Sequence, residues 1–190
     1  MKGRESGMPE RDYWESFFNP SCIVERLGCS GLSGDIVEFG CGYGTFTIPA
    51  ARLNFGTVYA LDIEKELVSE TASNAAKAGL RNVVIEPRDI LADGCGRPDG
   101  SVDYAMLFNI LHVENPVNLL REAYRVIKTN GTVGIIHWRR DIPTPRGPSH
   151  DIRPTAEECR SWGEAAGLQF VRYESLCCCS WHWGLLMRRP

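Results

Sequence analysis

The chain has 190 residues, of which 43% are hydrophobic, and a formal net charge of −3. This length suffices for one well-buried core and is short for two ordinary domains, so we expect residues 1–190 to form a single domain. The slightly acidic balance gives no basic footprint for a nucleic-acid partner. We find no stretch of roughly 20 apolar residues that would span a membrane and no signal-peptide pattern, and therefore expect a cytoplasmic protein.

Eight cysteines are present, and in the absence of a secretion signal we expect reduced thiols rather than disulfides. No C-x-x-C pair occurs, so we predict no metal site. Cys177, Cys178 and Cys179 would alternate between two faces of a strand, which argues against a single shared ion. Small buried apolar residues are the favoured interpretation, because free cysteine often has that role. A soft-metal, metalloid or redox site is the alternative.

The hydrophobic pattern predicts strands and helices in alternation along the chain. One or two helices between Glu10 and Leu27 come first, interrupted near Asn19-Pro20. Predicted strands cover 35–39, 57–61, 82–86, 102–108, 132–138, 168–174 and 181–187. Predicted helices cover 44–53, 64–78, 116–128 and 155–167, the second of which stops at Gly79. Such alternation predicts parallel strands with helices on both faces.

Local residues refine the connections and helix ends of this predicted fold. The interval 87–101 is rich in glycine, so a loop or a single helical turn is expected there in place of a crossover helix. Asn115-Pro116 supplies an N-cap and a first-turn proline, and Thr155 with Glu158 forms a capping-box pattern. Asn130-Gly131 is expected to turn the chain into the strand at 132–138.

The most informative motif is the stretch from Val37 to Thr45, where an apolar strand enters a loop with glycine at every second position. Glycine permits sharp turns and lets a ligand approach the backbone N–H groups. Asp62 ends the next predicted strand, 20 residues after Gly42, where a carboxylate could accept hydrogen bonds from ribose hydroxyls. A dinucleotide fingerprint would place its third glycine three residues after the second, whereas Gly44 follows Gly42 by two. The motif therefore indicates a nucleotide-type cofactor, with a nicotinamide dinucleotide as the second interpretation.

Glu38-Phe39-Gly40-Cys41-Gly42-Tyr43-Gly44 followed by Leu61-Asp62 resembles motif I and its acidic partner in the class I S-adenosylmethionine-dependent methyltransferases. The chain is particularly similar to small bacterial and archaeal members of the ubiquinone/menaquinone type. This resemblance implies a Rossmann-like sheet of seven strands, mostly parallel, with helices on both faces and the last strand antiparallel. It also implies S-adenosyl-L-methionine as the cofactor, with residues 1–30 as a helical cap over its site.

The resemblance assigns cofactor contacts to the glycine loop. Gly40, Cys41, Gly42 and Gly44 would bring the backbone close to the methionine end of the cofactor. Glu38 would lie beneath the loop as part of the ligand shell. In the alternative, Glu38 is a capping carboxylate that only orders the loop.

Further cofactor contacts are implied after the next strands. Asp62 would bind the ribose hydroxyls, and Ile63 would pack on the adenine. Asp89 would face the adenine amino group with Ile90 beside the ring, although a solvated loop aspartate is the alternative for Asp89. Asn109 ends the fourth strand, at the sheet edge where ligands of open α/β folds bind, and is a candidate contact for the methionine moiety.

Candidate acceptor residues are fewer. His112 could remove a proton from an acceptor, or it could pack under the following helix. His137, Arg139 and His150 lie at or after the end of the fifth strand, where they could contact a polar or anionic substrate. The sequence lacks the Asn/Asp-Pro-Pro-aromatic signature that similar enzymes use on nucleic-acid and glutamine amino groups, so these acceptors are less expected.

We therefore predict an S-adenosylmethionine-dependent methyltransferase (EC 2.1.1.-) that acts on a small molecule. A non-catalytic S-adenosylmethionine-binding subunit and a thiol-rich metalloid-handling methyltransferase are the alternatives. An NAD-dependent oxidoreductase is the least favoured. Because the short interval 87–101 leaves little chain to enclose a bulky acceptor, a homodimer or a partner subunit could complete the acceptor site.

Overall fold

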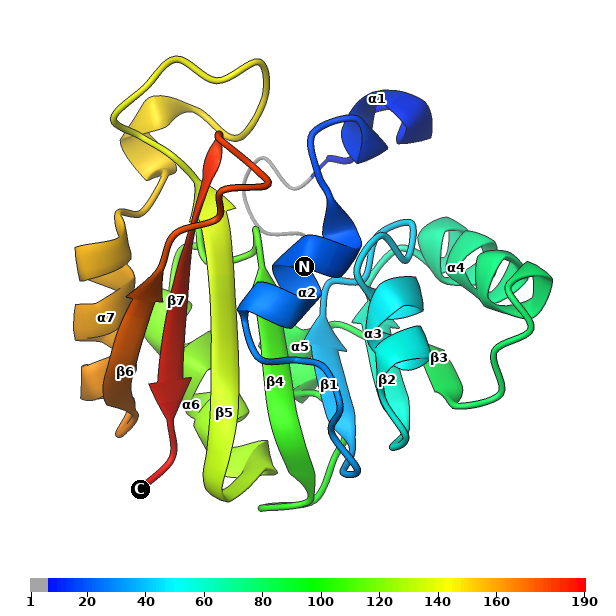
Figure 1. The fold of residues 1–190 in the computed structure, drawn as a ribbon. Helices are drawn as coiled ribbons and strands as arrows, with labels where there is room; N and C mark the ends of the chain where they lie inside the picture. The colour runs from blue at the N-terminus through cyan, green and yellow to red at the C-terminus, as the bar shows by residue number, and fades with distance from the viewer. Residues whose placement is uncertain (1–6) are drawn as a thin grey trace.

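A computed structural model describes residues 7–190, which fold around one seven-stranded sheet (Figure 1). The strand order is β3-β2-β1-β4-β5-β7-β6. The strands are β1 Ile36–Phe39, β2 Val58–Asp62, β3 Val83–Pro87, β4 Val102–Phe108, β5 Ile127–Trp138, β6 Gln169–Glu174 and β7 His182–Arg188. Strands β1 to β5 pair in parallel, and β7 pairs antiparallel with both β5 and β6. The predicted Rossmann-like sheet with an antiparallel last strand is confirmed.

Helices cover both faces of this sheet, as predicted (Figure 1). The helices are α1 Arg11–Glu15, α2 Pro20–Arg26, α3 Thr47–Leu53, α4 Lys65–Lys77, α5 Ile90–Asp93, α6 Pro116–Val126 and α7 Ala156–Ala165, with a 3₁₀ turn at His150–Ile152. Alternation along β1 separates two cores. Val37 and Phe39 pack with α6 and α7, whereas Ile36 packs with α2 and α3. Thus the helix break near Asn19-Pro20 and the strand limits agree with the sequence to within a few residues.

The β5 strand differs from the prediction because it begins at Ile127 and runs through the expected turn at Asn130-Gly131. Asn130 does adopt a turn-like conformation, with φ +64°, and its N–H donates to the Arg189 carbonyl. The register against β4 shifts at this point, so the Asn-Gly pair forms an irregularity within the strand. Of the predicted caps, the Thr155 capping box is present, whereas the Asn115 side chain makes no capping hydrogen bond.

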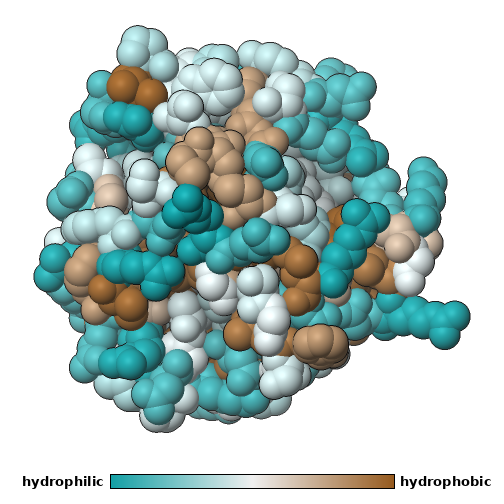
Figure 2. Space-filling model, viewed as in Figure 1, coloured by the Kyte–Doolittle hydropathy of each residue, from teal (hydrophilic) through white to brown (hydrophobic). Residues whose placement is uncertain are grey.

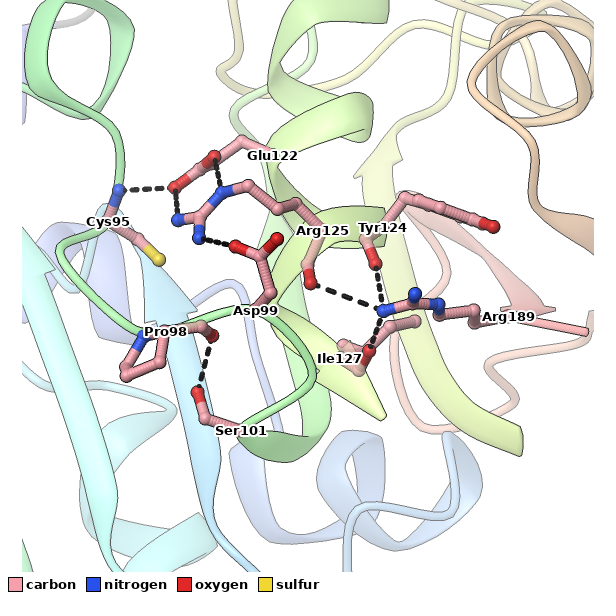
Figure 3. A network of polar contacts seen from close by, with 9 residues as sticks. All are labelled: Cys95, Pro98, Asp99, Ser101, Glu122, Tyr124, Arg125, Ile127 and Arg189. Atoms are coloured by element: carbon pink, nitrogen blue, oxygen red, sulfur yellow. Dashed lines mark hydrogen bonds and ion pairs between the residues drawn. The ribbon is translucent and has the colours of Figure 1, made fainter. Parts of the chain in front are cut away.

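The connection between β3 and β4 contains only the single turn α5, as predicted. Side chains of α6 hold the rest of it in place (Figure 3). Glu122 accepts a hydrogen bond from the Cys95 N–H at 2.7 Å, and Arg125 donates to both Glu122 and Asp99. The Arg125 guanidinium lowers the pKa of Glu122 to about 2. This network replaces the packing that a crossover helix would supply.

Arg189, just after β7, secures the carboxyl end of α6 (Figure 3). Its Nη1 donates to the backbone carbonyls of Tyr124, Arg125 and Ile127 at 3.3, 3.3 and 2.8 Å. The last carbonyls of a helix lack intrahelical partners, so the guanidinium satisfies groups that would otherwise need water.

One disulfide contradicts the expectation of reduced thiols. Cys22 in α2 is bonded to Cys178 in the turn between β6 and β7, 156 residues away in sequence. The separation concealed this pairing, because only the tertiary fold brings α2 against the end of β6, where Arg26 also pairs with Glu174.

The other cysteines are free thiols, all buried except the exposed Cys177. The interpretation of the triplet as buried free thiols therefore holds for Cys179 and is wrong for the exposed Cys177 and for Cys178, which is half-buried and disulfide-bonded. Within residues 7–190, no three His, Cys, Asp or Glu side chains form a group that could hold a metal ion.

The surface shown in Figure 2 is largely hydrophilic, with hydrophobic residues in scattered groups. In the described part of the chain, no helix is long and apolar enough to cross a membrane. Two of the exposed large hydrophobic residues, Ile63 and Leu91, border the cavity described next.

Candidate active site

A cavity of about 420 Å³ lies at the carboxyl ends of β1 to β5. This volume is within the usual range for small-molecule sites. Strand order reverses between β1 and β4, the position where open α/β sheets bind ligands. We call the part lined by residues 40–42, 45, 62–64, 67 and 88–91 the glycine-loop half. The part lined by residues 108–110, 112 and 113, together with Trp14, Phe46 and Trp138, is the aromatic half.

The glycine loop has the positive-φ backbone that its sequence predicted. Gly40, Gly42 and Gly44 have φ values of +79°, +54° and +81°, which disfavour larger residues. A Cβ at Gly44 would lie 2.9 Å from the Thr71 side chain, so this glycine also permits close packing on α4. Gly40, Cys41 and Gly42 line the cavity, whereas Gly44 does not.

Asp62 connects the glycine loop to the end of β2. Its carboxylate is 8% exposed and lines the cavity. It accepts hydrogen bonds from the Gly42 N–H at 2.8 Å and the Glu64 N–H at 3.0 Å. Burial raises the pKa of Asp62, and these backbone donors oppose that effect. Each carboxylate oxygen has a second lone pair, so Asp62 can still accept bonds from ligand hydroxyls. Ile63 lines the cavity beside it.

Glu38 does not line the cavity. Its side chain is 1% exposed and accepts a hydrogen bond from the hydroxyl of Thr47, the first residue of α3. Burial raises the pKa of Glu38 to about 8, although the Thr47 hydroxyl partly offsets this. The position matches the alternative interpretation, in which the carboxyl group orders the loop and the helix that follows.

Asp89 and Ile90 line the cavity after β3. The Asp89 side chain accepts a hydrogen bond from the Ala92 N–H at 3.1 Å and so caps α5. Neither interpretation of Asp89 from the sequence included this capping role. It fixes the carboxylate at the cavity wall.

Asn109 is the strongest indication that a ligand binds here. It lies in the cavity wall with φ +57°, and its N–H donates to the Ile136 carbonyl at 2.9 Å. Both polar atoms of its side chain are buried and find no hydrogen-bond partner within residues 7–190. A strained backbone and unsatisfied polar atoms each cost about 1–3 kcal/mol. Residues that carry such costs are often found at functional sites, where a bound ligand can supply the missing hydrogen bonds.

Of the two candidate catalytic histidines, His112 borders the cavity and His137 lies behind it. His112 lines the cavity, and its Nδ1 is 3.3 Å from Nε2 of His137. His137 is fully buried, stacks on Trp183 and does not line the cavity, so the expected direct contact with substrate is wrong for this residue. Burial holds the pKa of His137 well below its usual value, and the charges of Arg153 and the neighbouring histidines act in the same direction.

An aromatic wall that the sequence did not single out lines the cavity: Trp14, Phe46, Phe108 and Trp138. Ring centroids are 5.0 Å apart for Phe46 and Phe108 and 6.4 Å apart for Trp14 and Trp138. Phe18 contacts Trp14, Phe46 and Trp138 and joins the two pairs. In the sequence these rings are indistinguishable from core residues.

The N-terminal segment closes one side of the cavity. Gly7, Met8, Pro9 and Trp14 are in its lining. The Tyr43 hydroxyl donates to the Pro9 carbonyl at 2.8 Å, and Trp14 Nε1 donates to the Thr45 hydroxyl at 3.2 Å. The predicted cap begins in residues 1–6, which lie outside the described part of the chain.

The proline-rich loop after β5 closes the other side through Arg146, Gly147 and Pro148. Arg153, which is 5% exposed, donates to the Pro148 carbonyl at 2.5 Å and to the Thr144 hydroxyl at 2.6 Å. A buried guanidinium therefore fixes the shape of this loop. Arg139 and His150 were candidate contacts, and neither lines the cavity; Arg139 pairs with Asp141.

The family model for a methyltransferase domain matches residues 33–175, which is more than half of the chain. The chain belongs to this family. A structure described as a SAM-dependent methyltransferase from Aquifex aeolicus superposes on the methyltransferase domain with a TM-score of 0.82. That alignment covers 95% of this chain and 94% of the other at 22% identity, and so shows the fold alone.

Curated relatives of this methyltransferase domain have different names. Ubiquinone biosynthesis O-methyltransferase of Caulobacter vibrioides is 28% identical over 121 residues, covering 62% of this chain and 45% of the relative. A tRNA/tmRNA (uracil-C(5))-methyltransferase of Saccharophagus degradans is 39% identical over 56 residues, covering 30% of this chain and 15% of the relative. The chain thus spans less than half the length of either relative.

Proposed function

We propose that this methyltransferase domain uses S-adenosyl-L-methionine to methylate a small-molecule acceptor. The observation that carries the proposal is the arrangement of Asp62 and Asn109 at one cavity. Asp62 is fixed by the Gly42 N–H with acceptor capacity remaining, and Asn109 presents polar atoms that have no partner within residues 7–190.

The residues present fit this cofactor. An amide such as Asn109 offers both a donor and an acceptor, which matches the carboxylate and ammonium groups at an amino-acid end. Asp62 would accept hydrogen bonds from ribose hydroxyls, and Gly40 and Gly42 would let the backbone approach the methionine end. Ile63 and Ile90 supply apolar surface for adenine, near the Asp89 carboxylate. When bound, the cofactor supplies an electrophilic methyl group on a sulfonium.

A small acceptor is favoured by the enclosure of the cavity. The segments around Pro9 and Pro148, which are distant in the sequence, both contribute to its lining, and the Tyr13 hydroxyl donates to the Pro145 carbonyl at 3.2 Å. A large acceptor would have to enter between them. Positioning the acceptor in line with the methyl group can itself supply roughly 7–11 kcal/mol of the barrier reduction. A non-catalytic subunit would bind the cofactor without turnover.

Calorimetric titration with S-adenosylmethionine, S-adenosylhomocysteine and NAD tests the cofactor. We expect micromolar affinity for the first two and no binding of NAD. The variant Asp62→Asn should weaken binding by about 1–3 kcal/mol, roughly 5- to 150-fold, because a neutral amide is a poorer acceptor for these donors. The matched control is Asp12→Asn, on an exposed residue outside the cavity. Binding of NAD alone, or unchanged affinity in Asp62→Asn, would refute the proposal.

A further inference from the structure

The three consecutive cysteines lie in the turn between β6 and β7, outside the cavity. The Cys179 N–H donates to the Leu176 carbonyl at 2.8 Å, so Cys177 and Cys178 occupy the two central positions of a β-turn. Leu176 and Cys179 are each 4% exposed and anchor the turn on both sides. The tip of the turn therefore presents an exposed free thiol, that of Cys177, directly beside the disulfide between Cys178 and Cys22.

One face of α2 contacts both cysteines at the tip of this turn. Cys22 and Arg26 are four residues apart and so lie on the same face of the helix. Cys22 is bonded to Cys178, and Arg26 Nη2 donates to the Cys177 sulfur at 2.9 Å. The free thiol and the disulfide are thus held against the same helix face.

The charged groups around the Cys177 sulfur are positive on balance. Arg26 pairs with Glu174 at 3.4 Å, and Arg172 pairs with the same carboxylate at 2.9 Å. Two guanidinium groups share one carboxylate, which leaves positive charge beside the sulfur. A charged donor binds a thiolate more strongly than a thiol, and the thiolate is the form that attacks a disulfide.

The turn can bring either central cysteine to Cys22. Cys177 and Cys178 are neighbours in the chain, so their Cα atoms are about 3.8 Å apart, and a small movement of the turn brings Cys177 within bonding range. Both residues lie outside β6 and β7, so the hydrogen bonds of the sheet do not oppose this movement.

The same turn holds the segment that supports the aromatic wall of the cavity. Cys179 Sγ donates to the Phe17 carbonyl at 3.1 Å, and the disulfide holds α2, which follows Phe17 in the chain. Phe18 contacts Trp14 and Trp138, and both of these rings line the cavity. Opening the disulfide therefore removes a covalent attachment from the N-terminal side of the cavity.

We propose that Cys22, Cys177 and Cys178 form a thiol–disulfide exchange site for low-molecular-weight thiols of the glutathione class. Cys177 takes over the bond to Cys22, and the external thiol then opens this bond at the surface. Reduction releases α2 from the turn and loosens the aromatic wall of the cavity.

Each step balances in atoms and electrons. In the first step, the Cys177 thiol loses its proton to water and its sulfur bonds to that of Cys22. The Cys22–Cys178 bond breaks, and its electron pair goes to Cys178, which takes up a proton from water. In the second step, a glutathione thiolate attacks the Cys177 sulfur, and the electron pair of the Cys22–Cys177 bond goes to Cys22, which is protonated. A second glutathione releases the Cys177 thiol as glutathione disulfide forms, so two glutathione thiols are oxidised for one protein disulfide reduced.

Disulfide mapping tests the exchange of partners. The variant Cys178→Ser is treated with glutathione disulfide, its remaining thiols are blocked with N-ethylmaleimide, and its disulfides are assigned by mass spectrometry. We expect a bond between Cys22 and Cys177 in this variant, and the original bond between Cys22 and Cys178 in the matched variant Cys177→Ser. In Cys178→Ser, a Cys22 that stays free or that bonds to Cys179 would overturn the exchange.

The rate of reduction tests the roles of Cys177 and Arg26. Reduced glutathione should open the wild-type disulfide at least about tenfold faster than that of Cys177→Ser, which lacks the attacking thiol. Arg26→Gln should slow the reduction by about three- to tenfold, because the charged donor is lost. The control is Arg52→Gln, at an exposed position of α3, which should react at the wild-type rate. Equal rates in the wild type and Cys177→Ser would show that the external thiol attacks the Cys22–Cys178 bond directly, contrary to the proposal.

Hydrogen–deuterium exchange tests the effect on the cavity wall. Reduced glutathione should speed the exchange of amides in residues 11–26 of the wild type by at least about fivefold, because their covalent attachment is lost. Cys22→Ser lacks the attachment and should show the same fast exchange with and without glutathione. Unchanged exchange in a wild-type protein whose disulfide has been reduced would overturn the link to the wall.

Discussion

The buried carboxyl group of Glu38 should make the stability of this protein fall as pH rises. Burial raises its pKa from 4.5 to about 8 in the folded state. Between these values the folded protein retains a proton that the unfolded chain has released, so the free energy of unfolding decreases with increasing pH. One pKa unit corresponds to about 1.4 kcal/mol, and the full shift therefore to about 5 kcal/mol. Because the side chain is 1% exposed, solvent screening reduces this little.

The variant Glu38→Gln removes the titration and keeps an oxygen that can accept the Thr47 hydroxyl. Urea denaturation at several pH values from 5 to 9 should show similar stability for both proteins at pH 5 and a more stable variant at pH 9, by several kcal/mol. The control is Glu25→Gln, at an exposed position of α2. Parallel stability curves for wild type and Glu38→Gln across this range would show that the carboxyl group is ionised in the fold, contrary to our reasoning.

Three further predictions concern stability and binding together. Cys22→Ser should lower the free energy of unfolding by about 2–5 kcal/mol, because the disulfide to Cys178 closes a long loop. Dithiothreitol should lower the Tm of the wild type and leave the Tm of this variant unchanged. An equal shift of Tm in both proteins would show that the reductant does not act through this disulfide. Asn109→Gly should raise the free energy of unfolding by roughly 1 kcal/mol, because glycine adopts φ +57° without strain. Calorimetry should show weaker binding of the cofactor by this variant. Tighter binding would contradict the proposed contact between Asn109 and the cofactor. Arg153→Met should lower the free energy of unfolding by roughly 2–4 kcal/mol, because it removes a buried donor to the Pro148 carbonyl. It should also raise KM for the acceptor more than Kd for the cofactor. A larger effect on Kd for the cofactor would show that this loop contacts the cofactor and not the acceptor.

Local sequence determined most elements of this fold and the glycine-loop half of its cavity. Short-range signals were sufficient there: glycines whose positive φ larger residues disfavour, an acidic residue at the end of the next strand, and a capping box at Thr155. Asp62 and Gly42 could be matched because parallel neighbouring strands bring their ends to one edge of the sheet. Periodicity likewise sufficed for most helix and strand limits, since burial on one face repeats at fixed intervals, but not for the start of β5.

Tertiary structure alone decided the aromatic half, the disulfide and the roles of two buried side chains. Trp14 and Trp138 are 124 positions apart, and their proximity depends on how α1 docks near the end of β5. Cys22 and Cys178 meet for a similar reason. Glu38 and His137 carry groups that suit a site, but the face of the strand on which each lies directs Glu38 to α3 and His137 behind His112. Contacts between distant segments leave no periodic trace in the chain, because they arise from the packing of whole elements.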